Sequence, residues 1–183
     1  MSEDMVVRQC APTLAGLKTG SLFPCPYESK GALMQEIRSI NQMLVPKGLC
    51  LLPLRLSNKR ALLYLYRPTD LERDLSDQMA ADLLRQAGYP PQSSERCVVQ
   101  LIRRLAEEQE FPHEIGLFLS YPPEDVKGFI ENKARDSKCV GTWKVYGNVE
   151  RAKALFAQFQ RCTEIYCNLW QAGSSLEELA VAV

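Results

Sequence analysis

Hydrophobic positions recur at helical spacing along much of the chain. Apolar residues three or four positions apart predict helices over residues 29–44, 69–88, 95–108, 123–130 and 149–173. The last of these follows Gly147 and Asn148 and is the longest, about 34 Å for about 23 residues. Ser174 with Glu177 matches a capping box, which predicts a short final helix carrying Leu176, Leu179 and Val183.

Shorter apolar runs predict a β-hairpin in the first half of the chain. Residues 49–56 and residues 61–66 are rich in leucine and tyrosine and flank a short polar segment. Pro53 has no N–H to give to a neighbouring strand. It therefore indicates an edge strand or a bulge in the first of the two strands.

A β-α-β unit is predicted in the second half. Residues 115–119 are continuously apolar, as in a strand buried on both faces, and a helix begins at Pro123. Residues 142–146 form the next predicted strand, and a helical connection of this length suits two parallel strands. We therefore expect a single α+β domain over residues 1–183, with a mixed sheet packed against several helices.

Composition and charge exclude some classes of partner. The 183 residues are 46% hydrophobic, as in an ordinary globular protein with a full core. The 22 basic residues balance the 22 acidic ones, so no net field draws the chain onto nucleic acid. No run approaches the roughly 20 apolar residues that span a bilayer, and the N-terminus does not resemble a signal peptide. We expect a cytoplasmic protein with neither nucleic acid nor membrane as a partner.

The cysteines indicate free thiols. There are seven, and none forms the C-x-x-C pair of a zinc or redox site. The chain contains a single histidine, which cannot supply the usual histidine-rich metal site, so we expect no metal centre. The sequence does not identify a cofactor.

Candidate catalytic residues come from two segments. Imidazole that takes a proton from a thiol, with a carboxylate that orients the ring, is a nucleophilic arrangement. Cys10, His113 and Glu114 supply these groups, provided that residues 10–23 fold against His113 to form a shared pocket. The alternative is a buried thiol and a histidine that caps backbone groups between a helix and a strand.

Residues 10–25 offer two further possibilities. Lys18 lies between Gly16 and Gly20, and small residues let backbone N–H groups approach a phosphate, although the same glycines suit a tight turn. Cys25 followed by Pro26 fits a thiolate ligand of haem, although a rigid loop explains both residues equally well. We take Lys18 as a candidate ligand-binding residue.

Lys144 and Tyr146 are the other candidate ligand-binding residues. They alternate with Trp143 and Val145, so one face of the predicted strand presents a lysine beside a tyrosine and suits a planar ligand. The alternative is that these aromatic residues pack in the core or across strands.

Four segments of the chain carry a family resemblance: CAPTLAGLKTGSLF, RALLYLYRP, FPHEIGLFLSYPPEDVKGFI and GTWKVYGN. Together they resemble the bacterial family catalogued as domain of unknown function 3793, over nearly the whole chain. The resemblance implies no particular activity and leaves open whether the protein is an enzyme. Members similar to this chain occur mainly in anaerobic Firmicutes, and we expect them to be encoded near flavodoxin or iron-handling genes, which would imply a redox setting.

These observations lead to two functional hypotheses. The first is a protein that binds or processes a small molecule or cofactor in anaerobic redox or iron metabolism. The alternative is a non-enzymatic adaptor for a redox protein partner such as a flavodoxin-like protein, or for a transport protein.

Overall fold

A computed structural model describes residues 2–107 and 111–182. It confirms the α+β class, because helices pack with small antiparallel sheets. The chain separates into two compact units, which we call unit 1 (Met1–Thr69 and Arg161–Val183) and unit 2 (Asp70–Gln160). The expectation of a single domain stays a prediction. Among the described residues, no helix combines the length and the apolar character needed to cross a membrane.

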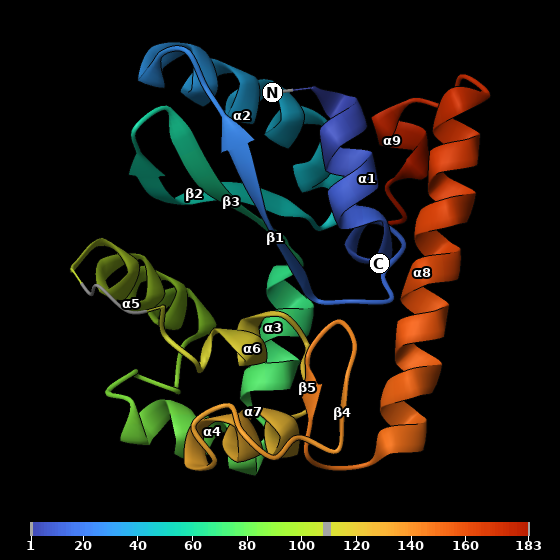
Figure 1. The fold of residues 1–183 in the computed structure, drawn as a ribbon. Helices are drawn as coiled ribbons and strands as arrows, with labels where there is room; N and C mark the ends of the chain where they lie inside the picture. The colour runs from blue at the N-terminus through green and yellow to red at the C-terminus, as the bar shows by residue number, and fades with distance from the viewer. Residues whose placement is uncertain (1, 108–110, 183) are drawn as a thin grey trace. The chain divides into compact units, whose positions relative to one another are not determined.

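Unit 1 contains a three-stranded sheet with the strand order β1-β3-β2. Its elements are α1 (Glu3–Leu14), β1 (Gly20–Pro26), α2 (Lys30–Leu44), the 3-10 turn η1 (Val45–Lys47), β2 (Cys50–Ser57), β3 (Arg60–Tyr66), the last part of α8 (Val149–Gln171) and α9 (Leu176–Leu179) (Figure 1). The predicted hairpin is confirmed, since β2 pairs with β3 in antiparallel register. The predicted bulge is also present, between Pro53 and Arg55 on an edge strand.

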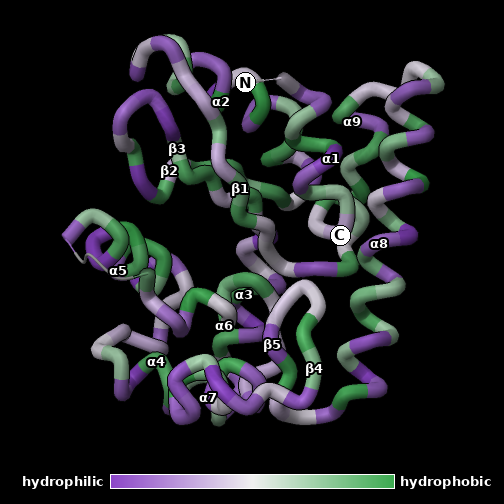
Figure 2. The backbone as a smooth tube through the Cα atoms, viewed as in Figure 1, coloured by the Kyte–Doolittle hydropathy of each residue, from purple (hydrophilic) through white to green (hydrophobic). Residues whose placement is uncertain are grey.

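The core of unit 1 lies between one face of this sheet and the helices α1, α2 and α9. Alternate strand residues such as Phe23, Leu51 and Leu63 point into it and are almost fully buried. The helix α2 confirms the helix predicted over residues 29–44, and its Leu33 and Ile37 belong to the same cluster. Figure 2 shows hydrophobic positions along β2 and β3, the two strands that carry much of this face.

The strand β1 was not predicted. Residues 10–25 fit no single period because α1 ends at Leu14 and a new element begins at Gly20. Pro24 and Pro26 hide the strand from a propensity reading, but β1 is an edge strand, where a missing N–H is tolerated. The burial alternates as in any half-buried strand, with Phe23 and Cys25 inward.

Unit 2 is mainly helical. Its elements are α3 (Pro68–Leu75), α4 (Gln78–Gln86), α5 (Ser94–Glu107), α6 (Ile115–Phe118), α7 (Pro123–Glu131), β4 (Cys139–Val140), β5 (Lys144–Val145) and the first part of α8. The single helix predicted over residues 69–88 is wrong. The side chain of Asp77 accepts hydrogen bonds from the N–H groups of Met79 and Ala80 and starts a second helix there. The predicted end of the next helix, Glu108, lies outside the described residues.

The predicted β-α-β unit is wrong. Residues 115–119 are buried as expected, but residues Ile115–Phe118 form the helix α6 rather than a strand. A short, continuously apolar run cannot be assigned by periodicity, because a buried helix and a buried strand give the same pattern. The strand predicted over residues 142–146 is reduced to Lys144–Val145, which pairs with β4 in a hairpin. Both described sheets are antiparallel, so the expected mixed sheet is also wrong.

The long helix α8 is confirmed at its predicted start. The side chain of Asn148 accepts a hydrogen bond from the N–H of Arg151 at 2.9 Å. The final helix is confirmed as well, but its capping box consists of Ser175 and Glu178, one residue later than predicted. Val183, assigned to this helix from the sequence, lies outside the described residues.

Candidate functional site

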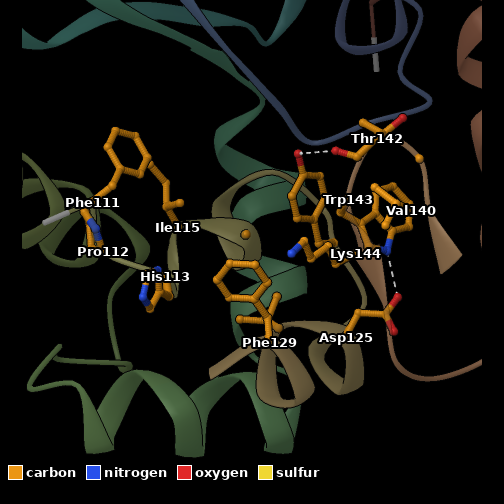
Figure 3. Close-up of a pocket in the computed structure, with 14 residues that line it drawn as sticks. Phe111, Pro112, His113, Ile115, Asp125, Phe129, Val140, Thr142, Trp143 and Lys144 are labelled. Carbon is orange, nitrogen blue, oxygen red and sulfur yellow. Dashed lines mark hydrogen bonds between the residues drawn. The ribbon is translucent and has the colours of Figure 1, made fainter. Parts of the chain in front are cut away.

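Unit 2 contains a pocket of about 330 Å³. Its lining comes from the segment before α6, from α6 and α7, and from the β4–β5 hairpin (Figure 3). A volume of this size is at the lower end of the range for small-molecule sites. The pocket joins His113 to the residues Thr142, Trp143 and Lys144, and its lining includes no residue of the segment 10–23 that we expected to share a pocket with His113.

Aromatic rings form much of the pocket wall, and several are held by contacts with other rings. The ring of Trp143 stacks on Tyr121, with centroids 4.8 Å apart, and meets Phe156 edge-on at 4.5 Å. The ring of Phe129 meets the imidazole of His113 edge-on at 5.1 Å. Rings held in this way present a rigid apolar surface to a planar molecule.

Asp125 fixes the position of the hairpin wall. Its side chain is almost fully buried, and it accepts three hydrogen bonds of 2.7 Å, from the indole Nε1 of Trp143 and from the backbone N–H groups of Tyr146 and Gly147. A buried carboxylate is tolerated where such donors satisfy it. Asp125 therefore joins the start of α7 to the end of the hairpin.

Close packing between α7 and the hairpin requires a glycine. A Cβ atom at Gly128 would lie 2.4 Å from the Cβ atom of Tyr146. The hydroxyl of Tyr146 donates a hydrogen bond to the carbonyl oxygen of Arg135 at 2.9 Å. Tyr146 therefore supports the wall from behind and does not line the pocket, although we predicted it to bind the ligand.

Lys144 places a cation in the pocket lining. Its Nζ donates a hydrogen bond to the carbonyl oxygen of Ala134 at 2.6 Å. In Figure 3 its side chain lies between Phe129 on one side and Trp143 on the other. Of the predicted ligand-binding residues, Lys144 is the one that contributes to this pocket.

His113 and Glu114 have different environments. His113 is exposed and lines the pocket, whereas Glu114 is buried and forms an ion pair with Arg104, in which Nη1 lies 2.7 Å from Oε1. The neighbouring Tyr89 is also buried, and burial and the Glu114 carboxylate raise its pKa. The carboxylate that we expected to orient the imidazole is thus bound by a guanidinium.

Cys10 and Lys18 belong to unit 1. The Cys10 thiol has no exposed surface, and burial raises its pKa well above the ordinary value, although the Lys18 ammonium and the Ser21 hydroxyl oppose the shift. Burial lowers the pKa of Lys18 to about 8. The hydroxyls of Thr13 and Ser21 lie 2.9 Å apart beside them. The structure therefore brings Cys10 and Lys18 near each other, in surroundings that oppose a reactive thiolate.

The loop around Lys18 does not form a phosphate cradle. The N–H groups of Gly16, Leu17 and Lys18 donate to carbonyl oxygens at the end of α1, at 3.2, 2.8 and 3.1 Å. They are therefore used to end the helix, and Gly16 adopts the left-handed conformation that such a turn requires. Cys25 is fully buried, and its thiol donates to the carbonyl oxygen of Pro26 at 3.3 Å, as expected for a structural thiol.

Sequence reasoning missed Asp125 and Phe129 as site residues. In the sequence, Asp125 is one of the acidic residues in the first turn of a helix, and Phe129 is an apolar residue of the same helix. The available sequence signal is their position on α7, which lies close to His113 along the chain. Among residues 2–107 and 111–182, no group of three or more His, Cys, Asp or Glu side chains is arranged to hold a metal ion.

Comparison with known proteins identifies the family of this chain but no individual relative. A family model described as "Protein of unknown function (DUF3793)" matches residues 6–180. No curated protein and no solved structure matches the chain.

Proposed function

The chain belongs to the family of proteins of unknown function DUF3793, and we propose that its unit 2 binds a small molecule with a planar aromatic body. The observation that carries this proposal is the pocket of about 330 Å³, with rings of Phe129, Trp143 and Tyr121 in its lining. Apolar pockets with a few polar groups are the usual form of a ligand site. Besides Asp125, the lining includes the polar residues His113, Thr142 and Lys144.

Rigid walls favour binding. Trp143 is held by two rings and by the carboxylate of Asp125, so little side-chain freedom is lost when a ligand packs against it. The Asp125 carboxylate already accepts three hydrogen bonds from its own chain, so it is satisfied without a ligand. The apolar surface and the residues at its edge therefore determine what the pocket accepts.

The two tryptophans of the chain provide an internal test. Trp143 lines the pocket, whereas Trp170 packs against the core of unit 1. We expect neutral 2-naphthamide to shift the indole N–H resonance of Trp143 and to leave that of Trp170 in place. Phe129→Ala should weaken this binding about fivefold by removing a wall, since one aromatic contact is worth about 1 kcal/mol. Met79→Ala, at an exposed position of unit 2 outside the pocket, is the control.

Two results would contradict the proposal: equal shifts of both indole resonances, or no shift of either at millimolar 2-naphthamide. The ultraviolet–visible spectrum of protein purified without oxygen adds a separate test for a haem, flavin or iron cofactor. The setting of anaerobic redox or iron metabolism rests on the family resemblance and belongs to the proposal. The adaptor alternative stays a prediction, which co-purification of a flavodoxin-like or transport protein would support.

A further inference from the structure

We propose that the ligand of the unit 2 pocket is an aromatic carboxylate whose acid group is bound by Lys144. This inference rests on the proposed function and names the chemical class of its ligand.

The charges around the pocket favour an anionic ligand. The lining contains two side chains of opposite formal charge, Asp125 and Lys144. Asp125 is bound by three N–H donors and is directed at the hairpin backbone and the Trp143 indole. Lys144 forms no ion pair with any residue in 2–107 or 111–182, and its hydrogen bond goes to a neutral carbonyl oxygen, that of Ala134. A cation without an anionic partner beside an apolar surface favours an anionic ligand.

The number of N–H donors on Lys144 suits a carboxylate. An ammonium group has three N–H donors. The carbonyl oxygen of Ala134 accepts one from Lys144 at 2.6 Å, so two remain for another acceptor. A carboxylate carries one charge and can accept both. A phosphate carries more charge and usually needs several backbone or guanidinium donors, so one lysine suits the carboxylate better.

The apolar walls of the pocket suit an aromatic body next to the acid group. Phe129 and Trp143 lie on two sides of Lys144 in Figure 3, so an acid group at Lys144 would place its attached body between apolar rings. The volume of about 330 Å³ suits one or two fused rings rather than a porphyrin. An aromatic ring packs against such walls with little loss of conformational freedom.

A matched pair of probes tests the charge separately from the shape. 2-Naphthoate and 2-naphthamide have nearly the same shape and differ in charge. Isothermal titration of the full chain should give at least tenfold tighter binding for the naphthoate. Lys144→Met should remove this preference and leave the affinity for the naphthamide within about twofold. Lys144→Gln, which keeps an N–H donor for Ala134, should also remove it and guards against a folding defect in the first variant.

Lys138 offers a matched control. It also donates to a backbone carbonyl, that of Gly147 at 2.9 Å, but it is exposed and does not line the pocket. Lys138→Met should leave both affinities unchanged. Equal affinities of the two probes in the native chain, or an unchanged preference in Lys144→Gln, would overturn the carboxylate inference and leave the proposed function standing. Failure of both probes to bind would overturn both.

Discussion

Each unit contains a buried charged side chain that is bound to backbone groups, and the two have opposite signs. In unit 1 the Arg67 guanidinium donates to the carbonyl oxygens of Thr13, Leu14 and Val181 at 2.8–2.9 Å. In unit 2 the Asp125 carboxylate accepts from two backbone N–H groups and one indole. Each side chain is only 2% exposed.

The two buried charges differ in the parts of the structure that they join. Arg67 joins the end of α1 to the segment after α9, beside a closed hydrophobic core. Asp125 joins α7 to a hairpin whose Trp143 forms part of a pocket. The same physical device, a buried charge satisfied by the chain itself, thus serves stability in unit 1 and also shapes a candidate site in unit 2.

The largest expected effect is on Arg67. Arg67→Met should lower the free energy of unfolding by about 3–5 kcal/mol, because buried carbonyl oxygens lose their donor. Urea denaturation checks this, with Arg103→Ala at an exposed position as the control. Under conditions where the variant is folded, its affinity for 2-naphthoate should equal that of the native chain. A loss below about 1 kcal/mol would mean that Arg67 does not stabilise unit 1 in this way.

Asp125→Asn should cost about 2 kcal/mol, since the amide nitrogen would place a donor against the indole N–H of Trp143. Unlike the Arg67 variant, it should also weaken the binding of 2-naphthoate, because the pocket wall loses its anchor. Glu131→Gln, at an exposed position of the same helix, should change neither quantity. If Asp125→Asn is destabilised but binds 2-naphthoate normally, Asp125 does not shape the pocket, and the proposed difference between Asp125 and Arg67 is wrong.

Lys18 provides a pH-dependent test of burial in unit 1. Its pKa of about 8 lies below the ordinary value of 10.5, so the unfolded chain binds more protons between these pH values and the stability contributed by Lys18 rises with pH. Lys18→Met should therefore be more stable than the native chain at pH 7, with an advantage that shrinks by about 1 kcal/mol at pH 9. The buried Cys10 has a raised pKa, so its contribution to stability falls with pH above about 9, opposite to that of Lys18. Because the native chain and the Lys18→Met variant both contain Cys10, this contribution largely cancels in the difference between them. A constant difference, as expected for the exposed Lys30→Met, would show that the Lys18 ammonium is not desolvated in the folded chain.

The smallest effect is expected at His113. His113→Ala should weaken the binding of 2-naphthoate about threefold, because the imidazole lies at the exposed edge of the pocket and contacts Phe129. The free energy of unfolding should change by less than about 0.5 kcal/mol. Thermal denaturation and titration on the same sample measure both. Unfolding of this variant would instead identify His113 as a structural residue.

Periodicity predicted the regular parts of the fold. The helix α2 and the β2–β3 hairpin follow from apolar spacing and from Pro53, because their local patterns agree with their tertiary surroundings. The strand β1 was hidden by Pro24 and Pro26, and the helix α6 was hidden in a run without polar positions. Local sequence does not contain the information that decides these two cases.

The site was predicted in part for a similar reason. His113 and Lys144 were selected for their chemistry, and both line the pocket. The role of Asp125 depends on partners 18 to 22 positions further along the chain, which no local motif indicates. Cys10 and Lys18 also have reactive chemistry in principle, but the burial of Cys10 and the partial burial of Lys18 in unit 1 are tertiary properties.

The central claim, that unit 2 holds a ligand between Phe129 and Trp143 with its acid group at Lys144, is tested most directly by intermolecular nuclear Overhauser effects from bound 2-naphthoate to ¹³C-labelled protein. The account predicts contacts from the naphthalene protons to the rings of Phe129 and Trp143 and to the side-chain methylenes of Lys144. Contacts confined to unit 1 residues such as Leu22 or Leu62, or no contact with the Phe111–Lys144 lining, would contradict it.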